Sequence, residues 1–177
     1  VNASILKRYT EEYDDHLYKL TQSTYKKVPT GIFIESYELT SFEASVIGKL
    51  WMKYPRELYE TAPPAFYLPD VSAVEPRGFS SQLISEVPYD DYILVTWKFR
   101  ATLEQDFSYQ QYPFEQNDIS LVLLYPDFSQ HILLVPDLDS YDILNPSTLP
   151  GLNPHIKAPS SRVISSYFSF KDMGYQS

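Results

Sequence analysis

The sequence predicts a mainly β protein, an antiparallel β-sandwich with an N-terminal α-helix. Residues 90–103 alternate apolar and polar side chains, which is the pattern of a strand with one buried face. Other short apolar segments follow one another with turn residues between them, as in sandwiches and barrels. The chain has 16 Tyr, 10 Phe and 14 Pro but only 5 Gly in 177 residues, which favours strands joined by Pro-containing loops. A parallel βαβ fold is disfavoured because no crossover helix is visible after residue 24.

An amphipathic helix is predicted between residues 3 and 24. Its apolar side chains recur at steps of three and four and form one helical stripe: Leu6, Tyr9, Tyr13, Leu17 and Leu20. Pro29 and Gly31 then end the helical pattern. We therefore divide the chain into an N-terminal helix and connection, residues 1–27, and a β-sandwich, residues 28–177, within a single domain.

The strands are predicted in chain order from runs of apolar residues. Residues 31–39 and 44–54 form a hairpin through the turn at 40–43, and a Pro-rich passage from 54 to 78 is expected to be a long loop. One face of the strand at 90–103 is expected to supply the core: Ile93, Val95, Trp97, Phe99, Ala101 and Leu103. The remaining predicted strands are 119–125, 131–136 and 162–170. The C-terminal residues resemble half of a hairpin, so a closing strand is expected beyond Ser177.

Charge and composition exclude several classes of function. The net charge of −9 and the absence of any long Lys/Arg cluster disfavour nucleic-acid binding. Without cysteine there is neither a thiol nucleophile nor a Cys-ligated zinc, and His16, His131 and His155 are too scattered to form a zinc site. No nucleophile elbow or phosphate-binding glycine loop is present. We therefore expect no enzymatic activity and no cofactor.

The segment 136–142 contains three closely spaced aspartates. Asp137, Asp139 and Asp142 have a spacing that resembles a calcium loop, but the glycine turn and the terminal bidentate Glu of such loops are missing. The alternative is a solvated acidic turn in which Pro136 begins the turn and Asp137 accepts hydrogen bonds from local amides. These aspartates are weak candidates for metal ligands.

A Pro between two aromatic residues precedes the strand at 119–125. In Tyr112-Pro113-Phe114-Glu115 the proline restricts its own φ and favours an extended conformation for the residue before it. The two aromatic side chains are then able to anchor the loop at the edge of the core. From the residues alone, this is a well-anchored loop between two strands.

The segment DFSYQQYPFEQNDISLVL, residues 106–123, resembles a loop and strand of the extracellular domains of pentameric ligand-gated (Cys-loop-type) channels. The whole pattern is still more similar to extracytoplasmic sensor regions of bacterial membrane signalling proteins, and this resemblance covers residues 28 to 170. The chain differs from the channels in having Glu115 for Asp, Asn117 for Gln and no flanking cysteines. It also has Trp51-Met52-Lys53-Tyr54-Pro55 in place of a Trp-x-Asp-x-x-Leu motif.

The resemblance implies two sets of functional residues. Tyr112, Pro113, Phe114 and Glu115 would form a coupling loop that faces the membrane. Ligand contacts would come from Trp51 and Tyr54 on one side of an aromatic pocket and from Tyr125, Asp127 and Phe128 on the other. Trp51 alternates with Lys49 and Lys53, so it lies on the more polar face of its strand, where an indole needs a partner.

The resulting functional hypothesis is a non-catalytic, periplasmic or extracellular ligand-sensing domain of a membrane-anchored bacterial receptor. Its ligand would be an unidentified small molecule, and its homo-oligomer a dimer for a signalling receptor or a pentamer for a channel. Three alternatives stay open: a secreted carbohydrate-binding sandwich, the extracellular domain of a prokaryotic ligand-gated channel, and, for the fold, an α+β sensor of the Cache or PAS type.

Overall fold

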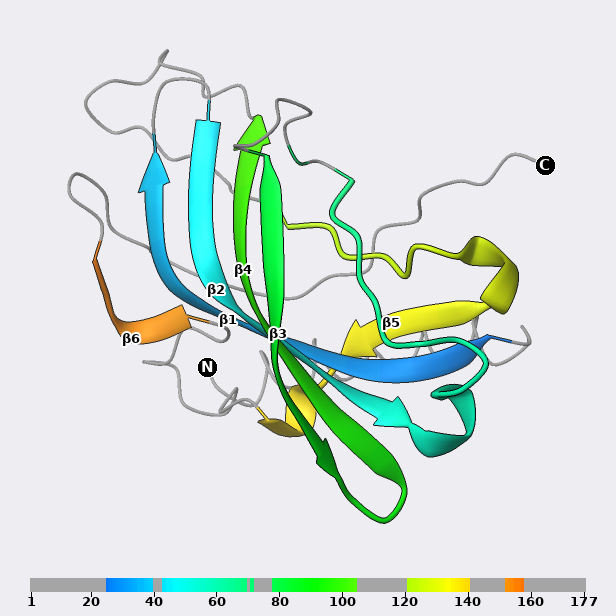
Figure 1. Cartoon of the computed structure of the whole chain (residues 1–177). Coiled ribbons are helices and arrows are strands. Elements are labelled where there is room, and N and C mark those ends of the chain that lie inside the picture. Colours follow the sequence, from blue (N-terminus) through cyan, green and yellow to red (C-terminus); the bar gives the residue numbers. More distant parts are fainter. Residues whose placement is uncertain are drawn as a thin grey trace, which may run out of the picture.

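The computed structural model describes residues 25–39, 43–69, 71, 78–104, 121–140 and 152–157 (Figure 1). Its strands are β1 (Lys26–Leu39), β2 (Glu43–Pro55), β3 (Phe79–Pro88), β4 (Tyr92–Glu104), β5 (Ile132–Pro136) and β6 (Leu152–Lys157). The helical elements of these residues are three short 3-10 turns, η1 (Arg56–Leu58), η3 (Phe128–Gln130) and η4 (Leu138–Ser140). None of the helical elements in these ranges is long and apolar enough to cross a membrane. The described part of the protein is mainly β, as the sequence predicts.

The strands form one mixed sheet of six strands in the order β3-β4-β2-β1-β5, with β6 also paired to β1. The pairs β1–β2, β2–β4 and β3–β4 are antiparallel, whereas β5 and β6 both run parallel to β1. The prediction of an entirely antiparallel arrangement is therefore wrong for two strands. Hydrophobic alternation reports which face of a strand is buried but not its direction, so the sequence pattern does not distinguish the two cases.

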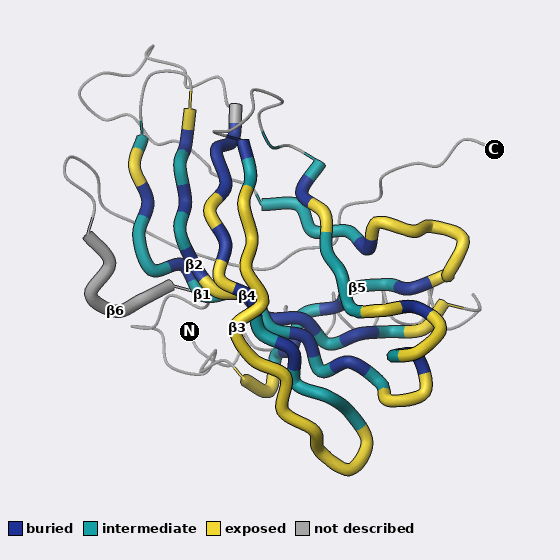
Figure 2. The backbone as a smooth tube through the Cα atoms, viewed as in Figure 1, coloured by how far each residue is buried: buried dark blue, intermediate teal, exposed yellow. Residues whose placement is uncertain are grey.

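Alternation along β2 and β4 creates the hydrophobic core. Leu50 lies opposite Trp97 and Met52 lies opposite Val95, so the side chains of both strands point to the same face, here called the core face. Figure 2 shows buried positions recurring along both strands. Trp97 is only 9% exposed, which confirms the core predicted from residues 90–103. Each large apolar side chain buried in this way stabilises the fold by roughly 1.5–3 kcal/mol.

The long strands bend near their middles (Figure 1), and local backbone features account for the bend. The register of β1 against β2 shifts between Ile34 and Ser36, as at a β-bulge, which bends a strand and increases its twist. Gly48 pairs with Ile34 beside this shift, and a Cβ at Gly48 would overlap the backbone oxygen of Phe33. β3 has a second register shift against β4. Glycine is therefore required at position 48, where a Cβ would meet the backbone of β1.

The core face is covered by two irregular segments, residues 56–69 and 121–125. Their buried side chains in the core are Leu58, Ala62, Leu68 and Tyr125. Phe66 packs edge-on against Trp97, with ring centroids 5.3 Å apart and planes at 70°. Backbone hydrogen bonds of 2.8 and 2.9 Å between Tyr67 and Leu124 join the two segments. All described strands belong to one sheet, so the second sheet of the predicted sandwich stays a prediction.

The other expectations have mixed outcomes. The antiparallel pairing of β1 with β2 and the strand at 131–136 are confirmed. The loop predicted for 54–78 is confirmed only in part, because Tyr54 and Pro55 still belong to β2 and Arg56–Leu58 form η1. Its other described residues are irregular apart from isolated bridges at Tyr67 and Val71. The predicted strand at 119–125 is wrong for residues 121–125, where an isolated bridge at Leu124 replaces it. β3 and β6 are not predicted from the sequence; β3 is exposed along nearly its whole length and therefore lacks an apolar face to reveal it. The helix at 3–24 and the strand at 162–170 lie outside the described residues.

Candidate functional site

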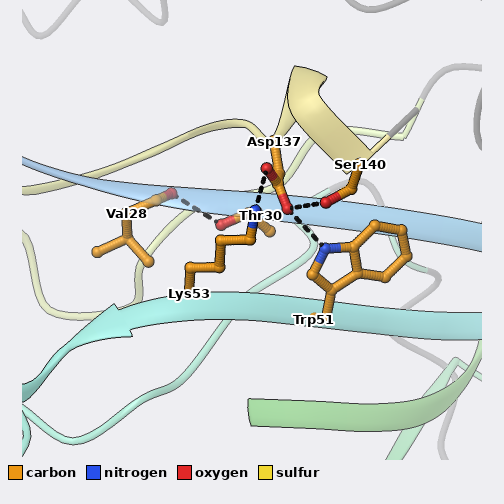
Figure 3. Close-up of polar contacts among 6 residues, drawn as sticks. All are labelled: Val28, Thr30, Trp51, Lys53, Asp137 and Ser140. Atoms are coloured by element: carbon orange, nitrogen blue, oxygen red, sulfur yellow. Dashed lines mark hydrogen bonds and ion pairs between the residues drawn. The ribbon is translucent and has the colours of Figure 1, made fainter. Parts of the chain in front are cut away.

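Trp51 and Asp137, which the sequence indicates for different roles, are in direct contact (Figure 3). The indole Nε1 of Trp51 donates a hydrogen bond of 3.0 Å to Asp137 Oδ2. Lys53 Nζ lies 2.9 Å from Asp137 Oδ1 and forms a salt bridge with it. Ser140 Oγ donates a third hydrogen bond, of 2.6 Å, to Oδ2. We call these four residues the Asp137 cluster.

Strand alternation and the parallel docking of β5 position this cluster. Trp51 and Lys53 are alternate residues of β2, so both point to the face opposite the core, here called the outer face. Asp137 follows β5 directly, and its N–H donates to Thr30 O at 2.9 Å, which continues the pairing of β5 with β1. Figure 3 shows the side chains of Trp51 and Lys53 extending from β2 past β1 to Asp137. The cluster therefore fastens η4 across β1 to β2.

The Asp137 carboxylate is ionised although it is only 3% exposed. Burial by itself would raise the pKa of this carboxyl. Hydrogen bonds from Ser140, Trp51 and Lys53, together with the charge of Lys53, outweigh burial and hold the pKa below its ordinary 3.8. The hydrogen bond to Asp137 in turn raises the pKa of Lys53 above 10.5, against the smaller opposing effect of burial. At neutral pH the two groups form a partly buried ion pair with satisfied acceptors.

The described residues do not assemble a metal centre from the three aspartates. Both carboxylate oxygens of Asp137 accept hydrogen bonds from protein donors. Asp139 is exposed on η4, and Asp142 lies outside the described residues. In the ranges that the structure describes, no group of three or more His, Cys, Asp or Glu is arranged to hold a metal ion. The contacts of Asp137 are those of a structural ion pair.

Tyr54 and Tyr125, two of the predicted ligand contacts, are buried close together in the core. Tyr54 is fully buried, and its hydroxyl donates a hydrogen bond to the carbonyl oxygen of Ala62. Tyr125 is 5% exposed, and its hydroxyl donates to Pro63 O at 2.8 Å. Burial, followed by the neighbouring Tyr125 hydroxyl, raises the pKa of Tyr54. Both side chains thus fasten the irregular segment 56–69 onto the core face rather than facing solvent.

Asp127 and Phe128 lie in the exposed turn 127–131, which leads into β5; we call it the β5 turn. Asp127 caps η3, since its Oδ1 accepts hydrogen bonds from Ser129 N at 3.0 Å and from Ser129 Oγ at 2.6 Å. These bonds lower the pKa of Asp127. His131 ends the turn with a left-handed φ of 51°, and its carbonyl accepts a hydrogen bond of 2.8 Å from Lys26 N. The turn therefore has a defined conformation, in which Phe128 is 54% exposed.

The structure distributes the five predicted ligand residues over three places. Trp51 belongs to the Asp137 cluster, Tyr54 and Tyr125 to the core, and Asp127 and Phe128 to the β5 turn. The predicted coupling residues Tyr112, Pro113, Phe114 and Glu115 lie outside the described residues. Lys53 and Ser140 are not predicted from the sequence as members of this site. The signal for Lys53 was the spacing Trp51-x-Lys53 on one strand face, and the signal for Ser140 was the spacing Asp137-x-x-Ser140 in a turn. The need of Trp51 for a polar partner is confirmed.

No protein-family model matches this chain, and no curated protein matches it.

Proposed function

We propose that this chain is a non-catalytic ligand-sensing domain of a bacterial membrane receptor, positioned outside the cytoplasm. The proposal includes the channel-like sandwich with its N-terminal helix and a coupling loop at residues 112–115. The observation that supports it best is the connection made by β5. This five-residue strand joins the exposed β5 turn directly to the Asp137 cluster.

The β5 turn has the chemistry of a small-molecule contact surface. Phe128 is 54% exposed, and the neighbouring Tyr25 is 40% exposed. The Tyr25 and His131 rings have centroids 5.3 Å apart, so aromatic groups from two segments meet at one edge of the turn. Aromatic faces attract cations and flat apolar groups, and Asp127 adds a carboxylate. The ligand class that fits is a small aromatic or cationic molecule.

Transmission would pass along β5. A ligand that changes the β5 turn also acts on Ile132–Pro136, because the strand begins at the residue after His131. At its other end, the strand leads into Asp137, which holds η4 to β2. A two-state element is needed for any such coupling, and the Asp137 cluster, with its partly buried ion pair, is the candidate. Ligand binding would then bias how η4 is fastened.

The test is a thermal-shift screen of the purified chain against small aromatic and cationic compounds, with affinities then measured by calorimetry. We expect Phe128→Ala to weaken binding of a positive compound about tenfold or more, as for removal of a central aromatic contact. Tyr67→Ala is the matched control, because Tyr67 is an aromatic residue that is 47% exposed outside the β5 turn. Equal weakening by both variants would contradict this location.

The secreted carbohydrate-binding module is a second candidate, and one observation favours it. The rings of Tyr89 and Tyr92 are stacked, with centroids 4.9 Å apart and planes at 21°, and Tyr89 is 46% exposed. A pre-ordered aromatic surface of this kind suits the apolar face of a sugar. Saturable binding on a glycan array that is lost in Tyr89→Ala and kept in Phe128→Ala would favour this function over the receptor.

A further inference from the structure

Three cationic side chains gather on the outer face of the two central strands. Lys49 of β2 lies directly opposite Lys98 of β4 in the antiparallel register. Arg100 is two residues further along β4, on the same face and about 7 Å from Lys98 along the strand. All three side chains are exposed. We call Lys49, Lys98 and Arg100 the basic strip.

Among the described residues, the positive charges of the strip are only partly compensated. Like charges directly opposite one another destabilise a strand pair. Glu35 compensates only in part, since its Oε1 lies 3.6 Å from Lys49 Nζ. Lys98 and Arg100 have no ion pair among the residues that the structure describes. In a chain of net charge −9, positive charge concentrated in this way attracts an anionic partner.

A second surface of the same chain has the opposite charge. Four exposed carboxylates lie in η1, in the turn after it and in the β3–β4 turn: Glu57, Glu60, Asp90 and Asp91. None of them has an ion pair among the described residues. We call these four residues the acidic corner.

The backbone that carries the acidic corner is held in place. Arg56 Nε donates a hydrogen bond of 2.6 Å to the carbonyl oxygen of Tyr89, and the backbone N–H of Arg56 donates to Asp91 O at 3.4 Å. Tyr89 and Tyr92 stack across the β3–β4 turn. Because η1 and this turn are joined, their carboxylates are presented together.

We infer that the acidic corner of one copy of this chain docks on the basic strip of another copy. The inference depends on charge complementarity between the two surfaces. The acidic corner is an anionic surface of the same chain, and its docking would relieve the repulsion between Lys49 and Lys98. The contact is heterologous, since two different surfaces meet, so repetition produces a closed ring or an open chain of copies. This self-association goes beyond the proposed ligand-sensing function and does not require the small-molecule ligand.

Exposed ion pairs are weak and are screened by salt, which sets the expected behaviour. Sedimentation velocity of the purified chain should show self-association at about 10 mM ionic strength that weakens about tenfold or more near 0.3 M, where the screening length is several times shorter. A monomer at every salt and protein concentration would overturn the inference.

Charge-reversal variants distinguish this specific contact from a general effect of net charge. Lys49→Glu/Lys98→Glu reverses most of the charge of the basic strip, and Asp90→Lys/Asp91→Lys reverses part of the charge of the acidic corner. For each variant alone, the association constant should fall at least about tenfold. A 1:1 mixture of the two variants should associate again, because the acidified strip of one meets the basic corner of the other. No rescue in the mixture would overturn the inference.

Lys26→Glu/Lys27→Glu is the control, because it makes the same change in net charge at the start of β1, away from the strip. It should associate more strongly than the strip variant, and equal loss in both would overturn the inference. Circular dichroism checks folding, and Arg100→Glu replaces the double variant if that one unfolds.

A chain that stays monomeric while inorganic sulfate raises its melting temperature, an effect lost in the strip variant, would assign the strip to a small anion and overturn the inference.

Discussion

The indole of Trp51 lies directly over the Cα of Gly31, its partner across the β1–β2 pair. A Cβ at Gly31 would overlap Cε2 and Cζ2 of the indole. The missing side chain lets the ring cross β1 and reach Asp137 with its N–H. Gly31 and Trp51 are therefore required together, and the Asp137 cluster depends on both.

Gly31→Ala should destabilise the fold by about 1–3 kcal/mol, because a Cβ and the indole compete for the same space in a packed site. Urea denaturation measures the loss. In a Trp51→Ala background the same change should cost less than about 1 kcal/mol, since the overlapping ring is gone. Equal costs in the two backgrounds would show that the overlap does not determine the choice of glycine.

Gly48→Ala should destabilise the fold by about 3 kcal/mol, at least as much as Gly31→Ala. This loss should not depend on any neighbouring side chain. The Cβ would overlap the backbone oxygen of Phe33, which is unable to move without breaking the bend of β1. Phe33→Ala is the background for comparison, because it removes the side chain and keeps that oxygen. A rescue of Gly48→Ala by Phe33→Ala would contradict the backbone explanation.

Asp137→Asn should lower the free energy of unfolding at pH 7 by about 2–3 kcal/mol, because Lys53 loses its partner and a nearly buried position loses a charge-assisted acceptor. The pKa of Asp137 is depressed in the folded state, so its contribution is present above pH 3.8 and is lost as the pH falls through the folded value. The difference in stability between the wild type and Asp137→Asn should therefore shrink below pH 3.8. A difference that stays constant down to pH 2 would contradict this.

Trp51→Phe isolates the indole N–H from the ring. The variant keeps an aromatic ring on β2 but removes the donor to Asp137, and we expect a loss of roughly 1.5–3 kcal/mol. The folded-state pKa of Asp137 should rise, since one of the bonds that lower it is gone. NMR titration of the Asp137 carboxyl carbon measures that shift, and an unmoved pKa would show that the N–H does not stabilise the ionised form.

Tyr54→Phe should cost about 1–2 kcal/mol, because the carbonyl of Ala62 loses a buried hydrogen-bond donor. Tyr67→Phe, which removes the hydroxyl of an exposed tyrosine, should be close to neutral. The pKa of Tyr54 is raised in the folded state, so its contribution holds below pH 10 and is lost as the pH rises through the folded value. Ultraviolet titration of the wild type against Tyr54→Phe should show one fewer tyrosine ionising late in the variant.

The sequence predicts the core of β4, the β1–β2 hairpin and the strand at β5, because each of these depends on a local pattern. A strand with one buried face repeats its apolar residues at every second position, and Val95 and Trp97 display this directly. The same rule misses β3, whose residues are exposed on both faces. It also places a strand at residues 121–125, where the apolar side chains cover the core from an irregular segment.

The sequence by itself determined which face of each central strand is apolar, that Trp51 lies on the polar face, and that the chain carries an excess of nine negative charges. Only the tertiary structure decided that Asp137, 86 residues away from Trp51, is its partner, and that Lys49 and Lys98 are neighbours. The reason is physical. Side-chain alternation is a property of a single strand, whereas the pairing and direction of strands depend on long-range hydrogen bonds and packing that no local pattern encodes.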